Sequence, residues 1–399
     1  MPERQGPLVG VRVLDLTRVV AGPYATGLLA DFGARVVKVE VPRFGDEVRR
    51  VPDHVRGLSV TFNDLNRNKE GLSLDLRTER GREILLRLLP HFDVITENYK
   101  AGTLEKWNLG WEPLRAANPR IVYAALSGYG PEGPYAGRAS YDLIAQAESG
   151  LMLMTGEPDA PPVKTGVNLA DYIGGLFLAV GILSALRERD RTGRGQRADI
   201  SNQDVLATLL DSAPSWFRAT GREPRRTGNM HRAIAPYGTY RASDGWVVIG
   251  AGNPQMFRRA LRAIGREELL DDEEFRERAR RGTHCDEVNV LWREFAAKHT
   301  RDELQQICEQ GGIAFGRVHS IEDVARNPQL EHRGMSAEVE HPDGGGPVPT
   351  NGIPIQFLDA PGALRSAAPS LGEHSDAILR ECLGLSDEEL DALRRDGVI

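Results

Sequence analysis

The chain has 399 residues, of which 40% are hydrophobic and 27% charged, an ordinary globular composition with room for two or three domains. Its net charge of -7 gives no overall positive field, which argues against nucleic acid as a partner. Cys285, Cys308 and Cys382 are scattered, without C-x-x-C or histidines at ligand spacing. This pattern argues against a disulfide framework and a zinc site, and it fits a reducing cytoplasm.

Strand and helix patterns alternate along the first 200 residues, and no signal-peptide pattern precedes them. Strands are predicted at 11–16, 35–40, 72–76, 94–98 and 121–126, with helices at 24–32, 78–89 and 104–117. Such alternation predicts a parallel sheet with right-handed crossovers, in which ligands bind beyond the carboxyl ends of the strands.

The longest apolar segment, 172–186, is about fifteen residues long and contains three glycines. A membrane span needs about twenty residues, so we expect a buried core helix and no membrane partner. Asp171 directly precedes this segment, and Asn168 stands three residues before it, a spacing typical of a capping box. Local sequence alone therefore favours a capping role for Asp171. The alternative is a nucleophile whose ionised form is favoured by the field of the helix N-terminus.

The second half of the chain has a different texture. Residues 199–213 resemble one more strand-to-helix unit, and 222–228 are polar and rich in arginine. Residues 237–252 predict a hairpin with a Ser-Asp-Gly turn, and amphipathic helices follow to about 310. Residues 339–357 are β-like, and 386–398 predict a short helix. No G-x-G-x-x-G follows the first strand, and no P-loop, H-E-x-x-H or G-x-S-x-G is present.

Many segments together resemble the class III CoA-transferases, the family of formyl-CoA transferase and carnitine CoA-transferase. The matching segments run in order from about residue 8 to the C-terminus: 13–17 with 21–23, 36–40 with 45–46, 66–69 with 74–75, 97–99, 127–130 with 133–134, 141–142, 155–156, 161–162, Asp171, 192–196, 237–238 with 244–245, 322–323 with 328–329, and 371–374. Each match is weak alone, and their shared order makes the resemblance specific.

The resemblance implies an α/β fold. Its large domain is Rossmann-like, with a parallel sheet built from both chain ends (1–200 and 326–399). A linker (201–225) leads to a smaller α+β domain (226–325). The resemblance also implies an interlocked homodimer, in which two subunits are threaded through each other. No permanently bound cofactor or metal is expected, since coenzyme A enters as the thioester substrate.

The resemblance places Asp171 on the family's nucleophile and Tyr141, Gly250, Ala251 and Gly252 around the acyl group. It places eight residues on or beside the CoA site: Arg18, Val20, Leu74, Arg77, Asn98, Tyr99, Lys106 and Trp107. Arg77 and Lys106 are candidates for the CoA phosphates, or solvated helix-end charges, and Trp107 packs on the adenine or belongs to the core. Backbone N–H groups near Asp171, or in 250–252, are candidate oxyanion donors.

The implied activity is transfer of CoA from an acyl-CoA, with succinyl-CoA favoured, to a free carboxylic acid. Val20 and Ala139 stand where formyl-CoA transferase carries glutamine and lysine, which predicts a larger or less polar acyl pocket. The alternative is an isomerase resembling α-methylacyl-CoA racemase. It is disfavoured because Gly137 stands where that pattern has a histidine base. A binding protein that has lost the reaction is the third reading.

Overall fold

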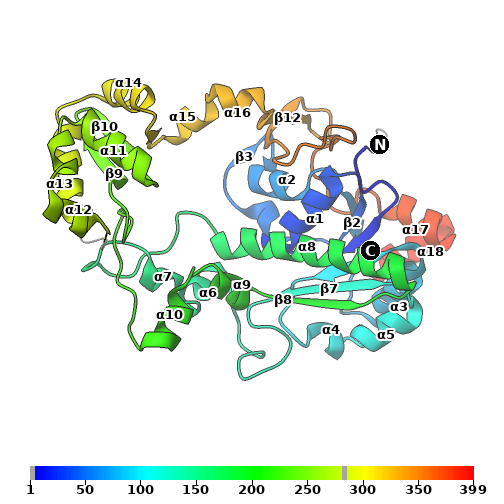
Figure 1. Cartoon of the computed structure of the whole chain (residues 1–399). Coiled ribbons are helices and arrows are strands. Elements are labelled where there is room, and N and C mark those ends of the chain that lie inside the picture. Colours follow the sequence, from blue (N-terminus) through cyan, green and yellow to red (C-terminus); the bar gives the residue numbers. More distant parts are fainter. Residues whose placement is uncertain (1–4, 281–284) are drawn as a thin grey trace. The chain divides into compact units, whose positions relative to one another are not determined.

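The computed structural model describes residues 5–280 and 285–399, which fall into two compact units. The first unit comprises residues 1–152, 164–214 and 328–399, and the second comprises 153–163 and 215–327. Both ends of the chain therefore belong to the first unit, and the second unit is inserted between them. Figure 1 shows the chain coloured along the sequence.

A six-stranded sheet forms the centre of the first unit (Figure 1). Every neighbouring pair is parallel, and the order is β5-β2-β1-β6-β7-β8. The strands span Arg12–Asp15 (β1), Arg35–Glu40 (β2), Glu70–Ser73 (β5), Val94–Glu97 (β6), Val122–Ser127 (β7) and Arg197–Ser201 (β8). The order reverses between β1 and β6, and doubly wound sheets bind ligands in the crevice at such a reversal.

Helices cover both faces of this sheet because successive strand residues point to opposite sides. Val13 packs with α1 (Ala21–Asp31) and α8 (Leu169–Thr192) on one face. Leu14 packs on the other face, in a core that also holds residues of α3 (Glu79–Leu88), α4 (Thr103–Lys106), α5 (Trp111–Ala117), α17 (Ser375–Leu383) and α18 (Asp387–Arg395). The α/β fold and the parallel sheet predicted from the sequence are confirmed.

Two predictions about this unit are wrong in detail. The sheet is not built from both chain ends, since all six strands lie between Arg12 and Ser201 and the C-terminal segment contributes helices instead. The predicted helix 104–117 is interrupted after Lys106, where Asn108 adopts a left-handed φ of 56° that a helix cannot continue through.

The predicted linker 201–225 is also largely structured. Ser201 accepts a hydrogen bond from the backbone N–H of Asp204 and thereby caps α9 (Asn202–Thr208), whose Val205 and Leu206 are buried. A further helix, α10 (Ala213–Thr220), follows, so only 209–212 and 221–225 of the predicted linker lie outside helices and strands. The first unit also contains α2 (Val60–Asn66), α6 (Asp142–Glu148), α16 (Pro328–His332), and the antiparallel pairs β3 (His54–Val55) with β4 (Leu58–Ser59) and β12 (Ser336–Glu340) with β13 (Pro347–Asn351).

Helix α8 is longer than the apolar segment that predicted it and ends at Gly193, whose left-handed φ of 73° suits a helix C-terminus. Gly175 permits α1 to lie close, because a Cβ there would stand 2.4 Å from the carbonyl oxygen of Ala21. In the part of the chain that the structure describes, α8 alone is long and apolar enough to span a membrane by length and composition. This is weak evidence, because core helices of soluble proteins pass the same test, and α8 packs one side on the sheet.

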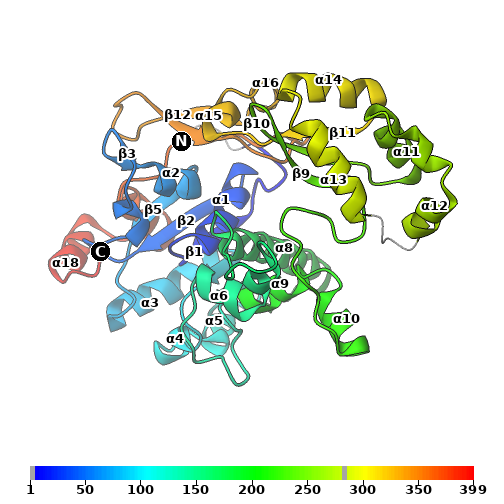
Figure 2. The same cartoon turned by 90° about the vertical axis from the view of Figure 1, so that its left-hand side faces the viewer.

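The second unit has a three-stranded antiparallel sheet in the order β11-β10-β9. β9 (Tyr237–Ala242) and β10 (Gly245–Gly250) form the predicted hairpin, and β11 spans Ala314–Arg317. Its core contains residues of α11 (Pro254–Ala263), α12 (Glu273–Arg280), α13 (Cys285–Ala296) and α14 (Arg301–Gly311), which Figure 2 shows around these strands. Two short helices, α7 (Leu151–Met154) and α15 (Ile321–Ala325), and three 3-10 helices (Glu47–Arg50, Leu89–His91 and Glu267–Leu270) complete the described elements.

Candidate active site

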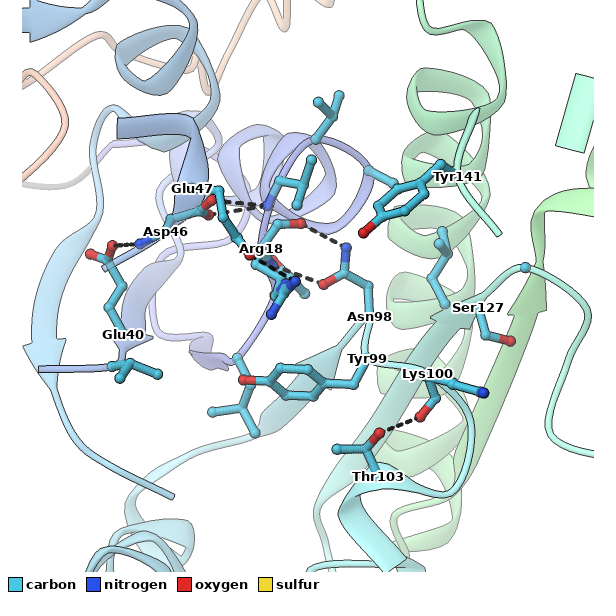
Figure 3. Close-up of a pocket in the computed structure, with 18 of the residues that line it drawn as sticks. Arg18, Glu40, Asp46, Glu47, Asn98, Tyr99, Lys100, Thr103, Ser127 and Tyr141 are labelled. Atoms are coloured by element: carbon cyan, nitrogen blue, oxygen red, sulfur yellow. Dashed lines mark hydrogen bonds and ion pairs between the residues drawn. The ribbon is translucent and has the colours of Figure 1, made fainter. Parts of the chain in front are cut away.

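A pocket of about 770 Å³ lies in the first unit, at the carboxyl ends of the parallel strands. Its walls come from the loops after β1, β2, β5, β6 and β7, from the start of α8 and from the start of α9. This is the surface that the alternating pattern predicted for a ligand. Figure 3 shows Tyr141 pointing into the pocket, which Arg18, Asn98 and Tyr99 also line.

Asn98 joins the two loops on either side of the point where the strand order reverses. Its Oδ1 accepts a hydrogen bond from the N–H of Arg18 at 2.8 Å, and its Nδ2 donates to the carbonyl oxygen of Arg18 at 2.7 Å (Figure 3). One amide side chain thus satisfies both polar groups of the Arg18 backbone. The loop after β1 is thereby held against the loop after β6 at the pocket wall.

A buried ion pair between Lys38 and Asp46 also supports the loop after β1. The Lys38 Nζ lies 3.0 Å from Asp46 Oδ2 and donates a second hydrogen bond to the carbonyl oxygen of Thr17. Both Asp46 oxygens accept from the N–H of Val19, at 3.2 and 3.1 Å. Burial alone would raise the pKa of Asp46, but the charge of Lys38 and hydrogen bonds from backbone N–H groups lower it. The ionised pair is therefore the stable form.

Val19 adopts a left-handed φ of 65°, a conformation that is strained for a β-branched residue. Its two hydrogen bonds to Asp46 hold it there, and Val19 lines the pocket. Strain of this kind persists only where the surroundings fix the backbone. The loop that presents Arg18 and Val20 to the pocket is thus held in one conformation.

Asp171 is the third residue of α8 and lies half-buried on the pocket wall. The predicted capping box is absent, since Asn168 forms no side-chain hydrogen bond at the start of the helix. Asp142 caps α8 instead: its Oδ1 accepts from the N–H of Ala170 at 2.7 Å and from the N–H of Asp171 at 3.4 Å. In the described parts of the chain, nothing is hydrogen-bonded to the Asp171 carboxylate itself.

The pKa of Asp171 is raised to about 7, first by burial and second by the negative charge of Asp142. The sequence predicted that the field of the helix N-terminus favours the ionised form of Asp171, and burial and the charge of Asp142 act against that field. The N–H groups at the start of α8, which are candidate oxyanion donors, already have acceptors within the protein. Those of Ala170 and Asp171 already donate to Asp142, and that of Tyr172 donates to the Asn168 carbonyl oxygen.

The pocket brings together most of the residues predicted to contact CoA. Its lining includes Arg18, Val20, Leu74, Arg77, Asn98, Tyr99 and Trp107, together with Tyr141 and Asp171. Trp107 packs edge-on against Tyr99, with ring centroids 5.5 Å apart, so it both lines the pocket and contacts the core. Arg77 pairs with Asp75 at 2.6 Å, although its side chain remains 60% exposed.

Other predicted residues lie elsewhere. Lys106, the last residue of α4, is exposed and is not part of the pocket lining. Gly250, Ala251 and Gly252 belong to the second unit, where they end β10 and begin the loop that follows. Among the described residues, no cluster of three or more His, Cys, Asp or Glu side chains is suited to hold a metal.

Sequence reasoning assigned no role to several residues that shape this site. Asp142, Lys38 and Asp46 all fall in segments that carried the resemblance, so a signal existed without a function attached to it. Asn202, which also lines the pocket, falls in none of those segments. Its place in the pocket could not be predicted from the sequence, because it depends on the packing of the segment after β8 against α8.

The model of CoA-transferase family III matches residues 8–375. The succinyl-CoA–D-citramalate CoA-transferase of Chloroflexus aurantiacus is 37% identical over 395 residues, covering 98% of each chain. The succinate–glutarate CoA-transferase of Agrobacterium fabrum is 36% identical, covering 96% of this chain and 97% of that one. The crystal structure of a CAIB/BAIF family protein from Brucella suis gives a TM-score of 0.83 at 38% identity, covering 95% of this chain and 100% of that one. These findings confirm the resemblance found in the sequence.

Proposed function

The chain belongs to CoA-transferase family III and is an enzyme, and we propose that it moves CoA from succinyl-CoA to a free dicarboxylic acid through covalent adducts of Asp171. The observation that carries the role of Asp171 is its position. Its carboxylate is half-buried on the wall of the pocket and hydrogen-bonded to no other described residue, which leaves both oxygens for a substrate. A partly desolvated carboxylate is a competent nucleophile.

The proposed reaction exchanges acyl groups without net change in charge or protons. An oxygen of Asp171 attacks the thioester carbonyl of the donor, the C–S bond breaks, and CoA thiolate leaves a mixed anhydride. The thiolate then attacks the aspartyl carbonyl, which releases the donor acid as a carboxylate and leaves an aspartyl-CoA thioester. The acceptor carboxylate reverses these two steps and departs as its CoA ester, restoring Asp171. One difficult substitution is thereby divided into easier ones.

Two features support a dicarboxylic acid as the acceptor. The two curated relatives act, by name, on citramalate and on glutarate, with succinyl-CoA or succinate as the other reactant. The pocket also contains Arg138, whose guanidinium carbon lies 3.7 Å from the centre of the Tyr135 ring. No carboxylate of the described residues is paired with Arg138, so it can receive the second carboxylate of a substrate. Arg138→Gln should therefore raise KM for glutarate more than for pentanoate.

The remaining CoA contacts are part of the same proposal. Arg18, Val20, Leu74, Arg77, Asn98, Tyr99 and Trp107 surround the CoA moiety in the pocket, with Tyr141 beside the acyl group. Lys106 reaches a CoA phosphate only by extending its flexible side chain from the end of α4. The family resemblance assigns Gly250, Ala251 and Gly252 to the acyl group, and a glycine-bearing loop of this kind excludes water, which would otherwise hydrolyse the anhydride.

We also propose an interlocked homodimer in the cytoplasm. The side of α8 that faces away from the sheet exposes Leu176, Phe177, Val180 and Leu183, with Val180 61% exposed. An apolar surface of this kind on an enzyme is covered by a partner. A second copy of the chain is the partner that the family resemblance implies. Val180→Glu should shift the protein toward monomers in light scattering.

The test of the proposed function is an exchange assay followed by mass spectrometry. Wild-type protein with succinyl-CoA and a panel of dicarboxylic acids should yield new acyl-CoA species, and its denatured mass should increase by bound CoA. Asp171→Ala should give neither product while it stays folded, with a melting temperature no lower than that of the wild type. Exchange that survives in Asp171→Ala would contradict the assignment of the nucleophile.

The racemase-like alternative is not favoured. The curated relatives described above are named CoA-transferases, and the sequence has Gly137 at the position of the second base. Deuterium uptake from solvent into an α-methylacyl-CoA measures that activity directly, and none is expected.

A further inference from the structure

Asn202 is a buried polar residue without a partner in the wall of the active-site pocket. It is the first residue of α9 and is 6% exposed. Its Oδ1 is fully buried and accepts no hydrogen bond, and no described residue is hydrogen-bonded to its Nδ2. Leaving such a group unsatisfied costs free energy, so a buried amide in a pocket is expected to meet its partner in a ligand.

The Asn202 amide occupies a space created by Gly174 of α8. A Cβ on Gly174 would stand 2.1 Å from Asn202 Oδ1 and 3.2 Å from a methyl carbon of Leu126, so only glycine leaves room for the amide. Gly174 follows Asp171 by three residues, which places both on the same face of the helix. The amide therefore lies beside the nucleophile's face of α8, about 4.5 Å further along the helix axis.

This offset separates Asn202 from the reacting carbonyl. Side chains on a helix lean toward its N-terminus, so the Asp171 carboxylate points away from the turn that holds Gly174. A carbonyl bonded to Asp171 thus lies closer to the N-terminal end of α8 than the Asn202 amide does. The amide can therefore contact atoms of the acyl chain that follow this carbonyl. An amide also offers a donor and an acceptor, and these can exchange positions by rotation about χ2. A hydroxyl group, which both donates and accepts, matches it.

We propose that Asn202 is a specificity-determining residue, which binds a hydroxyl substituent on the carbon chain of the acid attached to Asp171. The inference rests on the proposed function, since it requires the acid to be bound at Asp171. It narrows the substrate class from dicarboxylic acids to hydroxylated dicarboxylic acids. A site built to bond a hydroxyl discriminates against the analogue that lacks it, because the buried amide is then left unpaired.

The experiment compares acceptors of one length with succinyl-CoA as donor: glutarate, 3-hydroxyglutarate and both enantiomers of 2-hydroxyglutarate. For the wild type we expect kcat/KM for at least one hydroxylated acid to exceed that for glutarate by about tenfold. Asn202→Leu, which keeps the branched shape of the side chain and removes the hydrogen bonds, should abolish this preference and retain transfer to glutarate. Gly174→Ala should do the same, because its new methyl group displaces the Asn202 amide.

Leu126→Met is the matched control, since it alters the packing beside Gly174 without removing a polar group and should keep the preference. Either of two results would overturn the inference: a wild type that prefers none of the hydroxylated acids, or an Asn202→Leu variant that keeps the preference. Glutarate transfer continues in both cases and leaves the proposed function standing. Failure of every acid to react, glutarate included, would instead contradict the proposed function, and the inference would fall with it.

Discussion

The negative charge of Asp142 contributes to the raised pKa of Asp171, and replacing Asp142 with asparagine separates this effect from its role as helix cap. The asparagine Oδ1 can still accept from the N–H of Ala170 at the start of α8, so the helix cap is kept. The negative charge that contributes to the raised pKa of Asp171 is lost. The pKa of Asp171 should therefore fall in Asp142→Asn. It should remain above its ordinary value, because burial, the larger cause, is unchanged.

The magnitude follows from the wild-type pKa of about 7. A carboxyl with that pKa is ionised to about 90% at pH 8 and to about 10% at pH 6. Because only the ionised form attacks the thioester, kcat/KM of the wild type should fall by roughly tenfold between pH 8 and pH 6. In Asp142→Asn the decrease of kcat/KM on the acid side of the pH profile (the acid limb) should move to lower pH. The ratio of kcat/KM at pH 8 to that at pH 6 should then fall toward one.

The assay measures kcat/KM for exchange from succinyl-CoA between pH 5.5 and 8.5, at constant ionic strength. Glu188→Gln is the control, since it removes one carboxylate of α8 that lies about 25 Å from Asp171 along the helix, well beyond the screening length of about 8 Å. Its acid limb should coincide with that of the wild type. An acid limb that stays in place in Asp142→Asn, or moves to higher pH, would refute the electrostatic role of Asp142.

Three further predictions concern stability. Asp171→Asn should raise the free energy of unfolding at pH 8 by up to about 4 kcal/mol, since the folded-state pKa of about 7 lies roughly three units above the unfolded value and each unit corresponds to about 1.36 kcal/mol. Ionisation of Asp171 opposes folding as pH rises from about 4 to about 7, so urea melts should show a smaller gain at pH 5 than at pH 8. Lys38→Met should cost about 3 kcal/mol because it leaves Asp46 buried without its cation, and adding Asp46→Asn should recover part of the loss in the same melts. Val19→Gly should stabilise the fold by about 1 kcal/mol by relieving the left-handed φ, and a lower melting temperature would show that the side-chain contacts of Val19 matter more.

The sequence predicted the sheet well because buried parallel strands leave a strong apolar signal. The strand predicted at 35–40 coincides with β2, and those near β1, β6 and β7 differ by one residue at most at either end. Interruptions that depend on single backbone conformations were not predictable in the same way. The break after Lys106 requires Asn108 to adopt a left-handed φ, which its sequence neighbours permit but do not demand.

For the candidate site, the sequence predicted the identity of the nucleophile but not its protonation state. Asp171 was identified because a family pattern marks it, whereas its protonation depends on Asp142, which lies on another helix. A sequence gives the distance between these two carboxyl groups along the chain and says nothing of their separation in space. The spacing of Asn168 and Asp171 suggested a local cap, and a partner from a distant segment took that role. Tertiary contacts thus decide the charge on the nucleophile.

The role of Asn202 could not be predicted from its local sequence either. In the sequence it is a polar residue at a helix start, where asparagine commonly acts as a cap. In the structure the preceding Ser201 provides the cap, so the Asn202 side chain is not used for that purpose. The space that accepts it exists only because Gly174, on a different helix, lacks a side chain. An amide that neither caps a helix nor bonds to another described residue reduces stability, and a polar substrate in the pocket is the partner that we propose for it.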